Sequence, residues 1–347
     1  MFRSLLVALA IVLSPVAAAA ADRGLSSPSE ADAFLQQVMA ELSAYAGPHQ
    51  SLVSDAEDLV LFGIDGVGKA AEMADRRARS REVKEWADAW EAEARAKIAA
   101  IRARQTQLPP FPEATLQRIA ELDPSFRPRM AGFRHIGDET RESVDLCIAY
   151  LEGLVGSVRR AAGGDGDALA SVAAHVMYGT RLVVEAENAL LEVSIAVTGD
   201  EHPQNALARS SLHSNLAILA LYDLIMADLA EEPRDAVATV ATMREEAARS
   251  RAAALDIKRL AARMSAQFDG APASMESIQK IRTALATYND SSAVEVKVAD
   301  LLEAAAAKVA AGKVPLDVME TDFAGLDPLF TQRVELQRRR IKLFSGQ

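Results

Sequence analysis

The residues that interrupt helices, glycine and proline, are mostly gathered in a few short segments of this chain. These segments are residues 47–48, 109–112, 163–166 and 312–315. Between them, apolar residues recur at intervals of three and four, which places them on one face of an α-helix. Strand-like alternation of apolar and polar residues does not compete with this pattern. The sequence therefore predicts an all-α fold, with about ten helices in one or two antiparallel helical bundles.

The composition excludes several other classes of protein. There are 18 Gly and 13 Pro residues, and aromatic residues make up 5% of the chain, which are low values for a turn-rich β-sandwich or barrel. A single cysteine rules out an internal disulfide, an iron–sulfur cluster and a thiolate zinc finger. The net charge of -11 disfavours nucleic acid as a partner, because binding to phosphates requires clustered Lys and Arg.

The first 21 residues have the features of a signal peptide. Arg3 supplies a positive start, an apolar stretch follows from Leu5 to Leu13, and residues 19–21 form an Ala-Ala-Ala cleavage site. The apolar stretch is shorter than the roughly 20 residues that cross a bilayer. We expect cleavage after Ala21 and, because the segment has a bacterial character, localisation in the periplasm. No later segment has eighteen consecutive apolar residues, which predicts no membrane span in the mature chain.

The Gly-Gly-Asp-Gly segment at residues 163–166 is typical of a linker. It predicts two domains, an N-terminal helical bundle over residues 22–162 and a C-terminal helical bundle over residues 163–347.

A partial internal duplication is also visible. The sequence Leu-Asp-Pro at residues 122–124 reappears at residues 326–328, and each copy is followed by a phenylalanine. In each copy Asp is expected to cap a new helix, and Pro to occupy its first position. We interpret the motif as a repeated helix corner with a structural role.

One helix, expected over residues 167–198, carries polar side chains at intervals of three and four, with valines and leucines on the opposite side. Such a stripe fits a polar ligand cleft, in which an arginine holds a carboxylate or phosphate. It fits a solvated helix face equally well. The candidate ligand-binding residues are His175, Tyr178, Arg181, Glu185 and Asn188, and Glu192 continues the stripe.

The next helix is apolar on every side from Leu216 to Leu229, which is typical of the centre of a bundle. Asn215 and Tyr222 lie seven residues apart on one face of it. As buried polar groups they need hydrogen-bond partners, either within the protein or on a ligand. They are therefore further candidates for ligand binding.

The segment Gly63–Lys69 fits part of the GxxxxGK phosphate-binding motif, but Ala70 replaces the hydroxyl residue that would hold Mg²⁺. We interpret this segment as a flexible break between two helical halves. The basic run Arg338–Arg340 is interpreted as cations that favour a helix C-terminus.

Catalytic and metal-binding motifs are not evident. The five histidines are scattered, so the sequence predicts no metal site and no cofactor. Cys147 has core spacing with its apolar neighbours, which indicates a buried and inert thiol. No Ser, His and Asp pattern indicates a nucleophile, and no catalytic residue is predicted.

These features favour a non-enzymatic periplasmic protein that acts as an interaction, adaptor or scaffold protein in the cell envelope, with an envelope protein as its partner. The alternative is a periplasmic binding or sensing protein for a small anionic or amphiphilic ligand, held by the stripe that contains Arg181.

Overall fold

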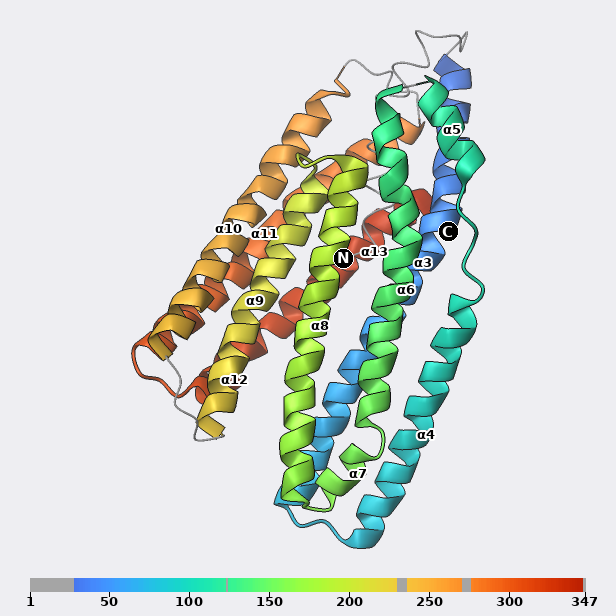
Figure 1. The fold of residues 1–347 in the computed structure, drawn as a ribbon. Coiled ribbons are helices and arrows are strands. Elements are labelled where there is room, and N and C mark those ends of the chain that lie inside the picture. Colours follow the sequence, from blue (N-terminus) through green and yellow to red (C-terminus); the bar gives the residue numbers. More distant parts are fainter. Residues whose placement is uncertain (1–27, 123, 230–235, 270–275, 346–347) are drawn as a thin grey trace. The chain divides into compact units, whose positions relative to one another are not determined.

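The computed structural model describes residues 28–122, 124–229, 236–269 and 276–345 (Figure 1). The regular secondary structure of these residues is entirely helical, which confirms the predicted all-α fold. The predicted signal peptide, residues 1–21, lies outside the described residues. Within the described ranges, no helix combines the length and the apolar character needed to cross a bilayer.

Eleven α-helices and two short 3-10 helices make up the described chain. The α-helices are α3 (Pro28–Asp75), α4 (Ser80–Gln105), α5 (Glu113–Leu122), α6 (Arg127–Leu154), α7 (Ser157–Ala162), α8 (Gly166–Thr198), α9 (Pro203–Leu229), α10 (Ala236–Ala266), α11 (Glu276–Ala310), α12 (Pro315–Asp322) and α13 (Leu326–Ser345). The 3-10 helices are η2 (Pro124–Phe126) and η3 (Phe323–Gly325).

The helix break predicted at Gly47–Pro48 is wrong, because α3 continues through Pro48. An internal proline removes one backbone hydrogen bond and costs about 3 kcal/mol. The residues on both sides of it are buried, including Tyr45 and Leu52, and their burial offsets this cost.

Contacts between Cα atoms divide the chain into two compact units, and neither is continuous in sequence. The first unit comprises residues 1–47, 110–136 and 187–347, and the second comprises residues 48–109 and 137–186. The segment 163–166, where we expected a boundary between two bundles, forms the turn between α7 and α8 and belongs to the second unit.

In the first unit, α9 packs against α10, and α10 packs against α11 (Figure 1). α13 also packs against α11 and crosses these helices obliquely in the view of Figure 1. An apolar core joins these helices with α12, and its buried members are Ala217, Ala220, Leu221, Ile225, Met243, Ala247, Val298, Leu302, Ala305, Ala306, Val318 and Leu326. Because many of these residues are alanines, the helices approach one another closely.

The second unit is held together by aromatic rings packed on glycines. Trp90 of α4 stacks on Phe62 of α3, with ring centroids 5.4 Å apart, and a Cβ atom at Gly66 would overlap the Trp90 indole. At Gly63 a Cβ atom would lie 2.8 Å from the side chains of Tyr150 and Leu154. The interpretation of Gly63–Lys69 as a flexible break is therefore wrong, because two of these glycines allow neighbouring side chains to approach α3.

The two copies of the repeated segment have the same order of elements. In the first, α4 is followed by a proline-containing loop, α5, η2 and α6; in the second, α11 is followed by a shorter such loop, α12, η3 and α13. Asp123, the cap predicted in the first copy, lies outside the described residues. In the second copy the helix already begins at Leu326, one residue before the Asp327 that we expected to precede it. A 3-10 turn therefore leads into each long helix.

Candidate functional site

Buried charged side chains lie together where α9, α10, α11 and α13 meet in the first unit. Glu295 of α11 and Arg340 of α13 are each only 1% exposed, and Arg333 also lies largely below the surface. Burying a charge is costly unless the group is paired and hydrogen-bonded. The partners of each of these groups therefore indicate what the region can bind.

Glu295 has its partners within the protein. Its Oε2 atom accepts a hydrogen bond from Arg333 Nη2, which makes a buried ion pair between α11 and α13. The same oxygen accepts a hydrogen bond of 3.1 Å from the Ser210 hydroxyl on α9. The negative charge of Glu295 is thus balanced by Arg333.

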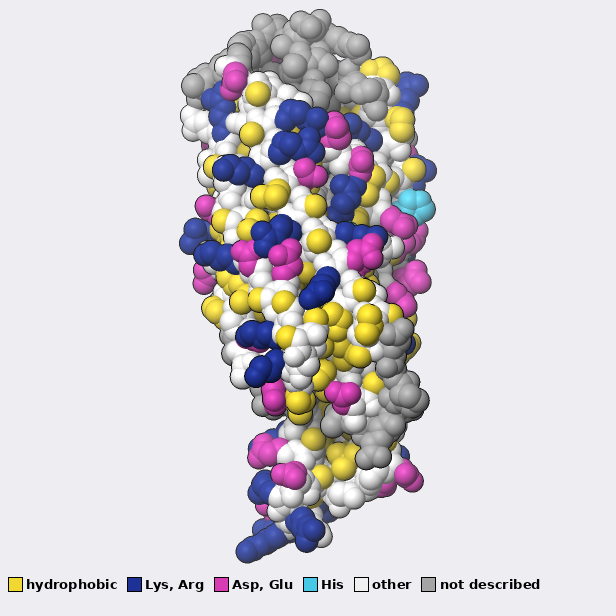
Figure 2. Space-filling view, turned by 90° about the vertical axis from the view of Figure 1, so that its left-hand side faces the viewer, with side chains coloured by type: hydrophobic (Ala, Val, Ile, Leu, Met, Phe, Trp, Pro, Cys, Tyr) yellow, Lys and Arg dark blue, Asp and Glu magenta, His cyan; other side chains and the backbone are white. Residues whose placement is uncertain are grey.

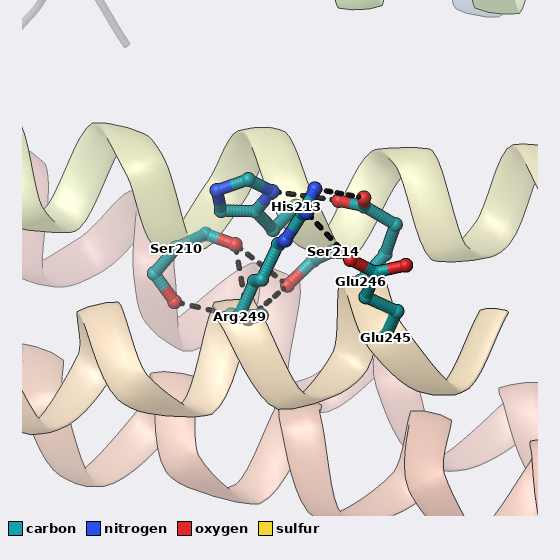
Figure 3. Close-up of polar contacts among 7 residues, drawn as sticks. Ser210, His213, Ser214, Glu245, Glu246 and Arg249 are labelled. Carbon is teal, nitrogen blue, oxygen red and sulfur yellow. Dashed lines mark hydrogen bonds and ion pairs between the residues drawn. The ribbon is translucent and has the colours of Figure 1, made fainter. Parts of the chain in front are cut away.

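A cluster of three serines connects α9 to α10 beside this ion pair. The hydroxyl oxygens of Ser214 and Ser250 are 2.9 Å apart, and Ser250 Oγ also donates to the carbonyl oxygen of Ser210 at 3.0 Å. Figure 3 shows Ser210 and Ser214 on α9 facing α10. These short side chains satisfy one another and allow the two helices to pack closely.

His213 and Glu246 form a second polar contact between α9 and α10. His213 Nδ1 donates to Glu246 Oε2 at 2.7 Å, and Arg249 Nη1 donates to Glu246 Oε1 at 2.8 Å (Figure 3). A Ser-His-acid triad requires a serine hydroxyl hydrogen-bonded to the imidazole. The hydroxyls of Ser210 and Ser214 are instead bonded within the serine cluster and to Glu295 and Arg333, so this arrangement lacks the geometry of a nucleophile.

Arg340 differs from Arg333, because the described residues provide no carboxylate within ion-pair distance of it. Its Nη1 atom donates to Ser291 Oγ at 2.6 Å, and its guanidinium carbon lies 4.7 Å from the ring centroid of Tyr288. Its Nε atom is buried and has no hydrogen-bond partner in the described structure. Burial lowers the pKa of Arg340 from its ordinary value, and burial raises the pKa of Tyr288 to about 12. In the described structure, Arg340 therefore carries a buried positive charge that Glu295 attracts electrostatically but that has no carboxylate within ion-pair distance.

A pocket of about 70 Å³ lies against these groups, between α9, α11 and α13. Arg333, whose Nε atom is also buried without a partner, lines it together with Arg340. Two guanidinium groups and one carboxylate give the pocket an excess of one positive charge, which suits it to hold an anion. The lining residues are Gln204, Leu207, Ala208, Ser211, Ser291, Glu295, Arg333, Leu336, Gln337 and Arg340.

None of the residues predicted on the stripe of α8 lines this pocket. His175 Nε2 donates to the carbonyl oxygen of Tyr150 at 2.9 Å, and its ring stacks on that tyrosine. Tyr178 is 49% exposed, and Arg181, Glu185 and Asn188 are exposed as well. His175 to Glu185 belong to the second unit and Asn188 to the first.

The two residues predicted on α9 are half-buried. Tyr222 packs against the apolar core of the first unit, and burial raises the pKa of its hydroxyl. Asn215 lies two helical turns earlier, and neither residue lines the pocket. Ligand binding by these residues and by the stripe stays a prediction.

Sequence reasoning missed Arg340, because it grouped this residue with its basic neighbours at a helix end. Arg338 and Arg339 are exposed, but Arg340 is buried. The available signal was the spacing of Arg333, Leu336, Gln337 and Arg340, because residues three, four and seven apart share one face of a helix.

Cys147 is buried, and burial raises the pKa of its thiol to about 12, which confirms the expectation of an unreactive core cysteine. Within the described ranges, His, Cys, Asp and Glu side chains do not gather in groups that could hold a metal ion. Comparisons of the chain with protein-family models, with curated proteins and with solved structures find no match.

Proposed function

We propose that this protein is a non-enzymatic binding protein for a small anion, held in the pocket between α9, α11 and α13. One observation carries the proposal. Arg340 is buried beside a pocket, its Nε atom has no hydrogen-bond partner, and the described residues place no carboxylate within ion-pair distance of it. An anion in the pocket would provide both the missing charge and the missing acceptor.

The energetics support a ligand rather than a purely structural role for Arg340. An uncompensated buried charge costs several kcal/mol, and the contacts with Ser291 and Tyr288 offset only part of that cost. A group that destabilises the empty protein and is complementary to a ligand is typical of a binding site. If residues 1–21 direct export as predicted, the anion is met in the periplasm.

The interaction or scaffold role predicted from the sequence has less support. A protein-binding surface usually contains a contiguous apolar patch with a polar rim. Among the described residues, the exposed large apolar side chains lie on or next to four different helices, namely Leu61, Tyr178, Val237, Leu255, Val314 and Leu316. On the face drawn in Figure 2, Lys and Arg are interspersed with Asp, Glu and apolar side chains. The scaffold role and an envelope protein partner stay predictions.

The proposal is tested by thermal unfolding of the full chain in the presence of acetate, lactate, sulfate and inorganic phosphate, each added as the sodium salt. We expect at least one anion to raise the midpoint of the wild type and of Arg339→Gln, whose side chain is exposed on the same helix. The same anion should not raise the midpoint of Arg340→Gln. Equal shifts in wild type and Arg340→Gln would refute the proposal, as would the absence of a shift with every anion.

A further inference from the structure

We infer that the anion is a monocarboxylate with a short apolar chain of two or three carbon atoms beyond the carboxylate. This inference rests on the proposed function, and it adds the chemical class of the ligand. Four properties of the pocket lead to it: its net charge, the Nε–Nη2 edge of the buried Arg340 guanidinium, its volume and its apolar wall.

The charge of the pocket selects a monoanion. Arg333 and Arg340 contribute two positive charges to its lining and Glu295 contributes one negative charge. A ligand with one negative charge leaves the region neutral. A dianion would leave a buried negative charge beside Glu295, with the desolvation cost that any unbalanced buried charge carries. Succinate and doubly ionised phosphate are disfavoured for this reason.

The orientation of hydrogen bonds at Arg340 favours a planar carboxylate. In the described structure, the Nη1 atom of Arg340 donates a hydrogen bond of 2.6 Å to Ser291 Oγ. The edge of the guanidinium that is formed by Nε and Nη2 remains for a ligand. This edge presents two parallel N–H groups, which match the two oxygens of one carboxylate. The buried Nε atom without a partner is one of this pair.

The volume limits the size of the ligand. One bound water needs about 10–15 Å³ in a cavity measured this way, so the pocket of about 70 Å³ holds roughly five or six non-hydrogen atoms. Propionate and butyrate are of this size. The pocket is partly open to solvent, and octanoate would leave most of its chain outside it.

The apolar wall of the pocket explains why an inorganic anion is a poorer match. Leu207 and Ala208 of α9 and Leu336 of α13 supply apolar surface to the pocket. Sulfate and phosphate carry oxygen atoms on every side, and those facing this wall would lose hydrogen bonds to water without replacement. A short carboxylate places its alkyl chain there and gains from the burial.

The test is isothermal titration calorimetry of the full chain with propionate, butyrate, succinate, inorganic phosphate and octanoate. We expect propionate or butyrate to bind at least tenfold more tightly than the other three. Arg340→Gln should weaken this binding at least tenfold, whereas Arg339→Gln should leave it unchanged. Circular dichroism of Arg340→Gln at the same temperature establishes that the variant is folded.

A second variant tests the apolar wall without changing any charge. Leu207→Ala enlarges the pocket on the side of the alkyl chain, so we expect the preferred carboxylate to become longer, from propionate towards pentanoate. Arg340-dependent binding of succinate or phosphate with equal or higher affinity would overturn the inference and leave the proposed function intact. The loss of Arg340-dependent binding for every probe would overturn both.

Discussion

Arg333 and Arg340 lie seven residues apart on one face of α13, but only Arg333 has a carboxylate partner in the described structure. The two arginines line the same pocket and are both largely buried. Arg333 therefore belongs to an ion pair that holds α13 against α11, whereas the described residues place no carboxylate within ion-pair distance of Arg340. Because of this difference, we expect that removing the charge of Arg340 and removing the charge of Glu295 change the free energy of unfolding in opposite directions.

Removing the charge of Arg340 should not destabilise the empty protein. Arg340→Met keeps an extended side chain against the ring of Tyr288 and removes the cost of burying an unpaired cation. We expect the free energy of unfolding, measured with urea in a buffer without carboxylates, to stay the same or rise by about 1–2 kcal/mol. Arg339→Met, at an exposed position, serves as the control and should have an effect within about 0.5 kcal/mol. A loss above about 2 kcal/mol would show that Arg340 has a structural role.

Removing the charge of Glu295 should have the opposite effect. Glu295→Gln leaves Arg333 without its counter-charge inside the protein, which typically costs about 3–5 kcal/mol. We expect a value near the lower end, because the Arg333 side chain retains 17% exposure. Urea denaturation of Glu295→Gln and of Glu335→Gln, an exposed position on α13, measures the difference. Similar stabilities for the two variants would contradict the prediction.

Two glycines of α3 should respond oppositely to alanine. At Gly66 a Cβ atom would overlap the indole of Trp90, so Gly66→Ala should destabilise the protein by about 1–3 kcal/mol. At Gly68 a Cβ atom meets open space, and Gly68→Ala should stabilise the helix by about 0.5–1 kcal/mol. The midpoints of thermal unfolding should therefore move in opposite directions. If both midpoints fell, the packing described for Gly66 would not be the cause.

His202 should make the protein less stable in mild acid. Burial lowers the pKa of this imidazole to about 3 from an ordinary value of 6.5, with a smaller contribution from Arg129. Because the unfolded chain binds the proton more tightly, His202 contributes stability above pH 6.5, and this is lost as the pH falls towards 3. Between pH 7 and pH 5 the loss should be about 2 kcal/mol.

The contribution of His202 can be isolated by comparing variants at the two pH values. His202→Asn keeps an acceptor for the backbone N–H of Gln204, which bonds to His202 Nδ1 at 3.1 Å. The stability of His202→Asn, measured by urea denaturation at pH 7 and pH 5, should therefore depend less on pH than that of the wild type. His135→Asn, at an exposed position, should keep the full dependence. The prediction fails if His202→Asn loses as much stability in acid as the wild type does.

The sequence predicted the all-α fold because long segments with a helical apolar period can bury their apolar faces only against other helices. It predicted α8 nearly to the residue, over residues 167–198, from its apolar spacing and from the glycines that flank it. It failed at Pro48 and Gly66, where general helix-breaking tendencies gave the wrong answer. At such positions, whether the helix continues depends on which side chains pack nearby, and the local sequence does not contain that information.

The pocket was harder to predict than the fold. Glu295, Ser291 and Gln204 are far from Arg340 in sequence, so only the packing of α9, α11 and α13 brings them together. The stripe on α8 was a stronger sequence signal, because its polar residues share one helix, yet most of them are exposed. Helical period identifies a polar face, but it does not distinguish solvent from a partner helix.

The arrangement of the pocket also has a consequence for folding. An intermediate in which α9, α10 and α11 have packed before α13 docks contains Glu295 and the serine hydroxyls without either arginine. Such an intermediate offers a negatively charged groove to small cations. Docking of α13 adds two positive charges, so the same groove would change sign and gain the excess positive charge on which the proposed anion binding depends.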